Sequence, residues 1–427
     1  MNATLPTPSQ PLRLALIGAG TRARDVYQPV WESLKPWCVP VAVCDPVAEN
    51  GQKLAMALGV PYYADIRKLV KDRPMEAALV VTPVPSHHSI SVFLSSNGIP
   101  NHTETTWASM VCQAKEMIAV AATNKVIVRV AENFFRAPID RFAQTVRDSG
   151  YLGRIGRIVT YADHTGYHND SRWIAFAKCH PEWVQCVNHD MAHPPFYSTP
   201  QRRHEKETLT ARFFRFPNDM MVMDVGSGHV KGHLGRHPRP GYTEFQGERG
   251  TLVHRAGEQT ELRFVSDAKL APAQEAAGNL WGGGMADVVT PVVYDENGHV
   301  WAGMHADTPT GRIEYVNPLA SHVKLDKDNP WWANGGWYLV AIMDHLVDFT
   351  LAVKGLRASE FTAEDALMSE MMEIGARESN LQEGRRIKLP IAGDLESDAI
   401  EREKQRQQFG CDPLDVEAML AVSFPKP

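Results

Sequence analysis

The chain has 427 residues, of which 44% are hydrophobic and 22% charged, and its formal net charge is -6. This length predicts two domains with substantial cores, and the composition is typical of a soluble globular protein. The negative charge argues against a nucleic-acid partner, and no apolar run reaches the roughly 18 residues that a membrane helix needs. Residues 1–11 lack the pattern of a signal peptide, so we expect a cytoplasmic protein. The six cysteines have no metal-type spacing and are expected to be reduced thiols.

The first predicted strand, residues 12–17, runs into a glycine turn that is followed by helix-forming sequence. Gly18 permits the tight turn, Gly20 lets a pyrophosphate approach the backbone, and Ala23 lets the helix pack close to the strand. The start of this helix offers free N–H groups to phosphate. The pattern predicts a dinucleotide site, and an ordinary corner that needs glycine for backbone reasons is the alternative. The predicted cofactor-binding residues of the turn are Gly18, Gly20, Thr21, Arg22 and Ala23.

The second predicted strand, residues 39–44, ends at Asp45. A carboxylate at this strand end can accept hydrogen bonds from an adenosine ribose. It also repels a 2′-phosphate, and the next residue is Pro46 rather than arginine. We therefore expect NAD as the cofactor, with NADP less favoured. A turn-forming Asp–Pro pair is the alternative interpretation.

Strand and helix patterns alternate through the rest of the N-terminal part. Their near-continuous apolar strands are typical of a doubly wound parallel α/β sheet of the Rossmann type. Helices are predicted at residues 48–58, 66–71, 89–96 and 109–123, and strands at 77–82, 100–104 and 126–130. The α/β unit is expected to end near Asn133.

Several segments in this order resemble the Gfo/Idh/MocA family, named after glucose–fructose oxidoreductase, inositol dehydrogenase and rhizopine catabolism. The segments are the glycine turn, Asp45, Thr82-Pro83 with His87, Glu104, Glu132-Asn133 with Arg136 and Pro138, and the stretch 245–252. The resemblance covers roughly residues 12–390. It implies a Rossmann domain followed by an α+β domain with a large open, mostly antiparallel sheet.

The resemblance also implies a function and an organisation. Members bind a nicotinamide cofactor and most oxidise or reduce sugars, polyols or similar carbinols. Further cofactor contacts are expected from Thr82, Pro83, His87, Glu104 and Asn133. The expected domains are residues 12–135 and 136–390, flanked by extensions at 1–11 and 391–427. We expect a homodimer or homotetramer that acts on a small molecule.

The segment after the fifth predicted strand departs from the family pattern. Where the family has Glu-Lys-Pro, this chain has Glu104-Thr105-Thr106. The family lysine contacts the reacting hydroxyl and the cofactor ribose. Thr105 can form hydrogen bonds but cannot act as a cationic acid, so another residue handles the proton or the chemistry differs from simple dehydrogenation. Glu104 and Thr105 remain catalytic candidates.

The second domain opens with a strand pattern at residues 155–162, and a stretch rich in histidine and aromatic residues follows. The resemblance implies a catalytic histidine on a helix in this region. We expect His189 to take that role as an acid–base residue, with His193 one helical turn later on the same face. The alternatives are a metal shared by the two histidines and histidines buried between helix and sheet. No metal site is predicted.

The remaining pattern predicts a sheet closed by helices. A hairpin is expected from residues 209–216 and 220–225, and further strands at 242–246, 250–254, 261–265 and 386–389. Residues 256–315 are expected to form a long irregular segment. Helices are expected at 339–353, which is apolar, from Thr362 to about 383, which begins with a capping box, and at 396–408. Gly282–Gly284 and the stretch 295–298 are read as loops or turns.

Three functions from different classes follow. The leading one is an NAD-dependent oxidoreductase for a CH–OH group of a sugar, cyclitol or related polyol. The second is a lyase, glycosidase or epimerase in which bound NAD oxidises the substrate only transiently. The third is a non-catalytic NAD-binding sensor.

Overall fold

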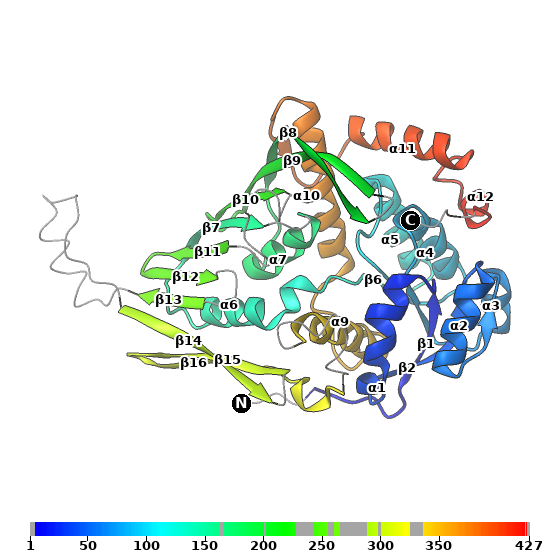
Figure 1. Cartoon of the computed structure of the whole chain (residues 1–427), viewed down its shortest axis with the longest axis horizontal. Helices are drawn as coiled ribbons and strands as arrows, with labels where there is room; N and C mark the ends of the chain where they lie inside the picture. Colours follow the sequence, from blue (N-terminus) through cyan, green and yellow to red (C-terminus); the bar gives the residue numbers. More distant parts are fainter. Residues whose placement is uncertain are drawn as a thin grey trace, which may run out of the picture.

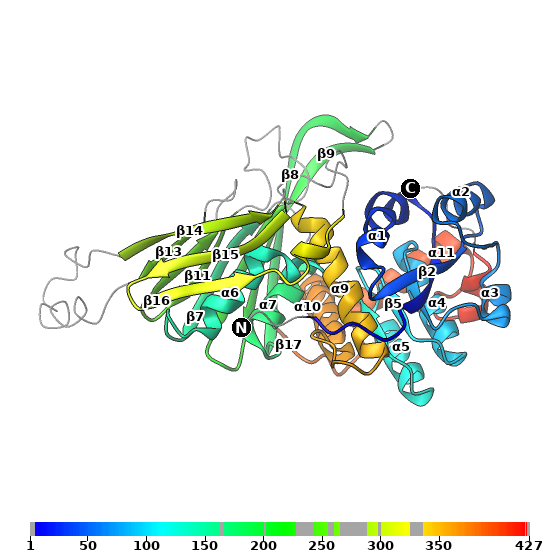
Figure 2. The same cartoon turned by 90° about the horizontal axis from the view of Figure 1, so that it is seen from below.

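The computed structural model describes residues 5–162, 166–199, 202–227, 242–254, 260–264, 288–297, 300–324, 336–422 and 424. These residues form two units, each built on its own sheet (Figure 1). The N-terminal unit is drawn in blue and cyan, and the larger green and yellow sheet lies on the other side of the molecule. Two helices, α9 (Trp337–Val353) and α10 (Ala363–Leu381), lie between them in both views (Figure 2).

The first sheet has six strands in the order β3-β2-β1-β4-β5-β6. Its strands are β1 (Leu12–Ile17), β2 (Cys38–Cys44), β3 (Tyr62–Tyr63), β4 (Ala77–Val80), β5 (Asn101–Thr103) and β6 (Val128–Val130). All neighbouring pairs are parallel, which confirms the predicted doubly wound sheet. The strand order reverses between β1 and β4, and sheets of this kind bind ligands at the carboxyl ends of the strands at such a point.

Helices cover both faces of this sheet because successive side chains of a strand point to opposite faces. Leu14 and Leu16 pack in one apolar cluster, and Ala15 and Ile17 pack in another. The helices are α2 (Ala48–Leu58), α3 (Ile66–Asp72), α4 (His87–Ser96) and α5 (Val111–Thr123). Helix α9, far along the chain, packs in the first cluster with the segment that follows the glycine turn.

That segment is an irregular helix. It runs through η1 (Ala23–Tyr27), a π-helical turn, η2 (Gln28–Val30), a 3₁₀ turn, and α1 (Trp31–Leu34). Pro29 explains the break, because proline has no N–H to donate and its ring clashes with the carbonyl four residues earlier.

The second sheet has 11 strands in the order β16-β15-β14-β13-β12-β11-β7-β10-β9-β8-β17. Only the β7–β10 pair is parallel among the described pairings, so the predicted large, mostly antiparallel sheet is confirmed. Its strands are β7 (Ile155–Ala162), β8 (Trp183–Thr199), β9 (Arg202–Arg215), β10 (Met221–Ser227), β11 (Tyr242–Gly247), β12 (Gly250–His254), β13 (Thr260–Phe264), β14 (Val288–Asn297), β15 (Val300–Thr308), β16 (Gly311–Val316) and β17 (Ile387–Lys388).

The expectation of one long irregular segment over 256–315 is wrong for its last part, which forms β14, β15 and β16. These strands contain glycine, aspartate and histidine, which lower strand propensity, but pairing with neighbours and burial of Met304 and Ala306 outweigh it. Asp295 lies inside β14 and not in a turn. The glycine run 282–284 lies outside the described residues.

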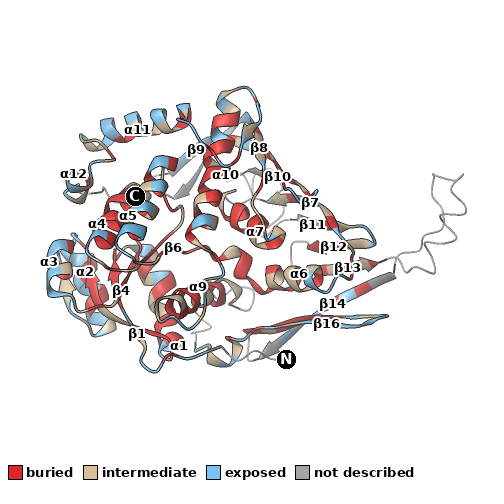
Figure 3. Ribbon diagram, turned by 180° about the vertical axis from the view of Figure 1, so that it is seen from behind, coloured by how far each residue is buried: buried red, intermediate tan, exposed pale blue. Residues whose placement is uncertain are grey.

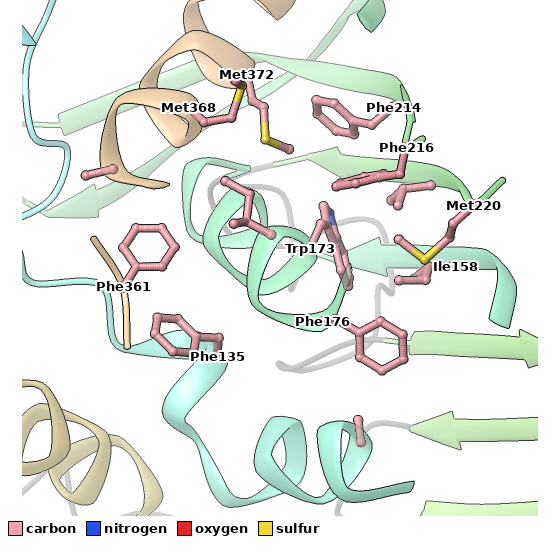
Figure 4. Close-up of a cluster of buried hydrophobic side chains, with 14 of the residues drawn as sticks. Phe135, Ile158, Trp173, Phe176, Phe214, Phe216, Met220, Phe361, Met368 and Met372 are labelled. Atoms are coloured by element: carbon pink, nitrogen blue, oxygen red, sulfur yellow. The ribbon is translucent and has the colours of Figure 1, made fainter. Parts of the chain in front are cut away.

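Helices α6 (Pro138–Asp148), α7 (Tyr167–Ala177) and α10 pack against one face of the second sheet. Figure 4 shows Trp173 and Phe176 of α7 among Ile158 of β7, Phe214 of β9 and Phe216 just after β9. The red, buried residues follow this layer and the centre of the first sheet (Figure 3). The predicted capping box at Thr362 is present in full. The C-terminal helices are α11 (Glu396–Phe409) and α12 (Val416–Leu420), and no helix in the described part of the chain could span a membrane.

Candidate active site

The glycine turn follows β1 at the point where the strand order reverses. Gly18 has a φ of +97°, and a Cβ there would lie 2.2 Å from the carbonyl oxygen of Val81. Glycine is therefore required at this position. A Cβ on Gly20, by contrast, would meet no atom within 4 Å. Gly20 thus faces open space at the start of the irregular helix, which is where a phosphate can approach backbone N–H groups. Ala23 is fully buried, as its predicted packing role requires.

Asp45 directly follows β2 and is 8% exposed. Its Oδ2 accepts a hydrogen bond from the Ala19 N–H at 2.6 Å, and its Oδ1 accepts one from the Val47 N–H at 2.7 Å. The carboxylate therefore holds the glycine turn in place. A carboxylate offers about four lone-pair sites, so these two bonds leave acceptor capacity for ribose hydroxyls.

The segment after β4 carries Thr82, Pro83 and His87. The His87 ring contacts the carbonyl oxygen of Thr82 through Nε2 at 2.8 Å and that of Thr106 through Nδ1 at 2.9 Å. His87 is completely buried, and this burial lowers its pKa. Through these two contacts His87 connects the segment after β4 with the segment after β5 and holds the two segments together.

Glu104 follows β5 and is the centre of a charged cluster. Its Oε1 accepts hydrogen bonds from Arg22 Nε at 2.5 Å and Tyr27 Oη at 2.9 Å, and its Oε2 accepts one from the Thr105 N–H at 2.9 Å. Burial acts to raise the pKa of Glu104, but the Arg22 guanidinium and these bonds outweigh it and lower the pKa overall. Glu104 is therefore ionised at neutral pH. The Thr105 hydroxyl also points to Oε2, at 3.3 Å.

A second carboxyl, Glu132, follows β6 and was missing from the predicted site. Its Oε2 accepts a hydrogen bond from Ser171 Oγ at 2.9 Å and lies 3.3 Å from His168 Nδ1. Burial raises the pKa of Glu132 to about 8, with the nearby charge of Glu104 acting in the same direction. The surroundings thus move the pKa values of the two carboxyls in opposite directions, a division common to acid–base sites.

His168 lies in the first turn of α7, next to Glu132, and its position is fixed by a buried network. Arg212 of β9 donates to the carbonyl oxygen of Gly166 at 2.8 Å and to Asp224 at 2.6 Å, and pairs with Asp170 at 3.0 Å. Gly166 is packed so closely that a Cβ there would lie 2.7 Å from the Arg212 guanidinium. These contacts hold the start of α7 against the second sheet.

Aromatic rings connect the two carboxyl clusters. Phe134 stacks on the His168 ring with centroids 4.2 Å apart, and it meets Tyr338 of α9 edge to face at 6.4 Å. Tyr338 accepts a hydrogen bond from Arg22. Asn133, a predicted cofactor contact, is completely buried next to these residues, between Glu132 and Phe134 in the chain. Glu104, Arg22, Tyr338 and His168 therefore belong to one continuous group.

The helix predicted around His189 and His193 is wrong. Both residues lie in strand β8, where His189 is exposed and pairs with Leu209 of β9. The side chain of His193 lies outside the described residues. Pro194 and Pro195 follow directly, and proline disfavours helix in the residue before it, so the sequence contained a signal against this helix. No hydrogen bond or ring contact joins His189 to Glu104, Glu132 or His168 among the described residues.

The sequence also contained a signal for His168. The resemblance implied a catalytic histidine on a helix after the strand at 155–162, and residues 167–177 contain no proline or glycine that would break a helix. His168 is thus the histidine on a helix after the first strand of the second domain. Glu132 lies in a segment that carries the family resemblance, but its contact with His168, like the contact of Tyr338 with Arg22, depends on the tertiary fold.

Comparison with known proteins finds one family model that matches the first unit of this chain. Residues 12–132 match the model of the GFO_IDH_MocA oxidoreductase family, described as an NAD-binding Rossmann fold. No curated protein matches the sequence significantly.

Solved structures share the fold of almost the whole chain. An oxidoreductase from Agrobacterium radiobacter, in complex with NAD+, L-tartaric acid and magnesium, has 15% identity and a TM-score of 0.63, with 88% of this chain and 98% of that chain covered. A levoglucosan dehydrogenase in complex with NADH and levoglucosan has 17% identity and a TM-score of 0.63, with 90% and 100% covered. The WlbA dehydrogenase from Bordetella pertussis, in complex with NADH and UDP-GlcNAcA, has 14% identity and a TM-score of 0.58, with 91% and 100% covered.

The matched segment contains the glycine turn, Asp45 and Glu104, and it ends at Glu132. Residues 12–132 are therefore similar to the NAD-binding Rossmann domain of the Gfo/Idh/MocA oxidoreductase family, and the parallel sheet of this unit agrees with that fold.

Proposed function

We propose that this chain is an NAD-dependent oxidoreductase that acts on a CH–OH group of a sugar, cyclitol or related polyol. The observation that carries the proposal is the meeting of two sets of residues at the carboxyl edge of the first sheet. One set is the open Gly20 turn with Asp45, which suits a dinucleotide. The other is the Glu132–His168 pair beside Glu104, which suits proton transfer.

The residues at the turn fit NAD. The space beyond Gly20 admits a pyrophosphate, and the backbone N–H groups at the start of the following helix can donate to it. Asp45 can accept hydrogen bonds from the adenosine ribose. Its negative charge disfavours the 2′-phosphate of NADP, so we expect NAD to bind more tightly than NADP.

His168 is our candidate for the group that moves the proton of the substrate hydroxyl. Imidazole titrates near neutral pH and suits this task. Nδ1 of His168 faces Glu132, so the substrate proton would arrive at Nε2 while the contact with Glu132 fixes the orientation of the ring. When bound, NAD+ supplies the hydride acceptor for the carbon. This proposal replaces the role that the sequence suggested for His189.

The substrate class rests on two supports. Partly exposed aromatic residues, Phe134, Tyr167, Trp337 and Tyr338, surround His168 and Arg22, and such rings pack well on the C–H faces of sugars. Structural neighbours bind levoglucosan and UDP-GlcNAcA, which supports a sugar-related substrate. No described residue favours the lyase or the sensor.

The first test is cofactor binding. The purified protein is denatured to identify any nucleotide that it releases, and the nucleotide-free protein is titrated with NADH and NADPH by fluorescence and calorimetry. We expect saturable NADH binding that is at least about tenfold tighter than NADPH binding. Failure to bind either cofactor would contradict the proposal.

The second test is turnover. A panel of sugars, cyclitols and alditols is incubated with enzyme and excess NAD+, and NADH formation is followed by absorbance. Steady NADH formation with at least one compound is expected. Product release without net NADH would instead indicate the transient-oxidation alternative, and binding without any turnover would indicate a sensor.

A further inference from the structure

Arg22 joins three parts of the molecule that are far apart in sequence. It lies in the first helical turn after Gly20, and its Nε donates to Glu104 Oε1 after β5 at 2.5 Å. Its Nη1 donates to the hydroxyl of Tyr338 at the start of α9. Tyr27, one helical turn later, donates to the same Glu104 oxygen. Arg22 is the one cation paired with Glu104 among the described residues.

The guanidinium of Arg22 is anchored but still accessible. Two of its three nitrogens are used by Glu104 and Tyr338, and the side chain keeps 31% of its surface exposed. Within the described part of the chain, Nη2 has no hydrogen-bond partner. Arginine remains protonated at any ordinary pH, so Nη2 is a permanent N–H donor of a charged group, although that charge is already paired with Glu104.

A chain of aromatic contacts connects Arg22 to His168. The Arg22 guanidinium lies 5.4 Å from the Tyr338 ring centroid, Tyr338 meets Phe134, and Phe134 stacks on His168. Thr105, directly after Glu104, brings no charge. When the hydroxyl proton of a carbinol departs ahead of the hydride, negative charge develops on the oxygen, and a fixed cation stabilises that charge.

We propose that Arg22 is the fixed cation of this active site and that its Nη2 donates a hydrogen bond to the substrate oxygen that loses its proton. The inference rests on the proposed function. The O–H proton passes to His168, the hydride passes from carbon to NAD+, and the oxygen becomes that of a carbonyl. Arg22 itself releases no proton in this step, so proton transfer and charge stabilisation are divided between His168 and Arg22.

The kinetic test compares Arg22→Gln, Arg22→Lys and Arg22→Gly with the wild type on the best compound of the panel. Arg22→Gln should lower kcat by about 100-fold or more, the usual range for loss of one charge-stabilising donor, while NADH affinity changes little. Arg22→Lys should keep part of the rate because it keeps the charge. Added guanidinium, below denaturing concentrations, should restore part of kcat in Arg22→Gly and in no other variant.

Arg13→Gln is the matched control. It also removes an arginine paired with a glutamate, Glu76, but this pair is exposed at the start of β1, at the opposite end of the strand from the glycine turn. We expect wild-type turnover. Thermal melts of all variants show whether a rate loss merely reflects unfolding, and the guanidinium rescue is a readout that a purely structural role would not produce.

A crystal of the wild-type enzyme with NAD+ and glycerol gives a readout that does not depend on turnover. A glycerol hydroxyl within hydrogen-bond distance of Nη2 supports the inference. The inference is overturned if Nη2 is bonded to the cofactor phosphates, or if Arg22→Gln turns over as fast as the wild type. In either case NADH binding and NADH formation by the wild type would still support the proposed function. If the wild type binds neither cofactor, both proposals fail together.

Discussion

Gly18 and Gly20 lie in one turn, but an added methyl group would meet very different surroundings. At Gly18 it would collide with the backbone of Val81, and at Gly20 it would collide with nothing. Gly20→Ala should therefore leave the melting temperature unchanged. It should weaken NADH binding by about tenfold or more, because the methyl group stands where the pyrophosphate approaches. Calorimetric titration and thermal melts measure both effects.

Gly156→Ala is the matched control, since a Cβ at Gly156 in β7 also meets no atom within 4 Å. This variant should change neither stability nor affinity by a measurable amount. If Gly20→Ala binds NADH as the wild type does, the phosphates do not approach this turn.

His168 and His189 are competing candidates that one pair of variants separates. His168 lies 3.3 Å from Glu132 inside the site, whereas His189 is exposed on β8. We expect His168→Ala to lower kcat by about 100- to 10,000-fold with little change in NADH affinity, as for loss of a general base. His189→Ala should reduce kcat by less than about threefold. The reverse result would restore the role that the sequence suggested for His189.

The buried carboxyl of Glu370 in α10 leads to a prediction of how the stability of the protein changes with pH. Its Oε1 accepts a hydrogen bond from the Trp107 N–H at 2.6 Å, while its Oε2 is buried without a hydrogen-bond partner among the described residues. Burial raises the pKa of Glu370 to about 8. The unfolded chain has a glutamate pKa near 4.3, so the folded state binds the proton more tightly. The resulting stability is fully present below about pH 4 and is lost as pH rises through about 8.

Glu370→Gln tests this sign. The amide keeps an oxygen for Trp107 but cannot ionise, so the melting temperature of the variant should fall less between pH 5 and pH 8.5 than that of the wild type. At pH 8.5 the variant should be more stable, by an amount of the order of a few kcal/mol. Glu132, whose pKa is also raised to about 8, leaves part of the slope in place. Identical slopes for both proteins would contradict the prediction.

At the scale of elements, local pattern was sufficient where an element's own sequence decides its structure. The bounds of β1 and α2 agree with the prediction residue for residue, because apolar runs, helical periodicity and the stop at Gly59 are local signals. In β8 and in β14 to β16 the pattern is mixed, and pairing with neighbouring strands decides the outcome. Such pairing is not visible in a single segment.

In the candidate site, too, some residues were predictable from local pattern and others depend on tertiary contacts. Gly18, Asp45 and Glu104 were predictable because each directly follows a recognisable strand of one parallel sheet. The partners of Glu104 were not predictable in the same way. Arg22 reaches it across 82 positions of sequence, and Tyr338 joins Arg22 across 316. The contact of Tyr338 with Arg22 exists only because α9 returns to pack on the first sheet.

The C-terminal helices contribute to the first unit in a way that a point variant can measure. Asp398 in the first turn of α11 accepts a hydrogen bond from the Val111 N–H at 3.0 Å, at the start of α5. It thus caps a helix nearly three hundred residues away. Asp398→Ala should lower the free energy of unfolding by about 1 kcal/mol, the typical loss for a helix N-cap. Asp394→Ala, at an exposed position that makes no side-chain hydrogen bond within the described chain, is the control, and equal effects would contradict a capping role.

At the scale of the whole molecule, one buried ion cluster joins the two units. Arg136, just after β6, donates to Asp348 of α9 at 3.0 Å and to Asp344 of α9 at 3.2 Å. It also reaches Glu360, in the segment before α10, at 3.3 Å. Helix α9 packs on the first sheet, and α10 packs on the second sheet and also against α5 and β6 of the first unit. Arg136 therefore ties the edge of the first sheet to both helices that lie between the units.

This cluster should make the two units unfold together. Arg136→Gln leaves Asp348 buried with a weaker set of partners, and breaking a buried pair in this way costs about 3 kcal/mol or more. We expect a lower melting temperature. On heating, NADH binding should be lost at a different temperature from the change in tryptophan fluorescence, because the two units no longer unfold together. Arg141→Gln is the matched control, because Arg141 also pairs with Asp344 and Glu360 but is 17% exposed where Arg136 is 3% exposed, so its loss should cost less. Coincident transitions in Arg136→Gln would show that the units are held together by apolar packing of α9 and α10 and not by this ion cluster.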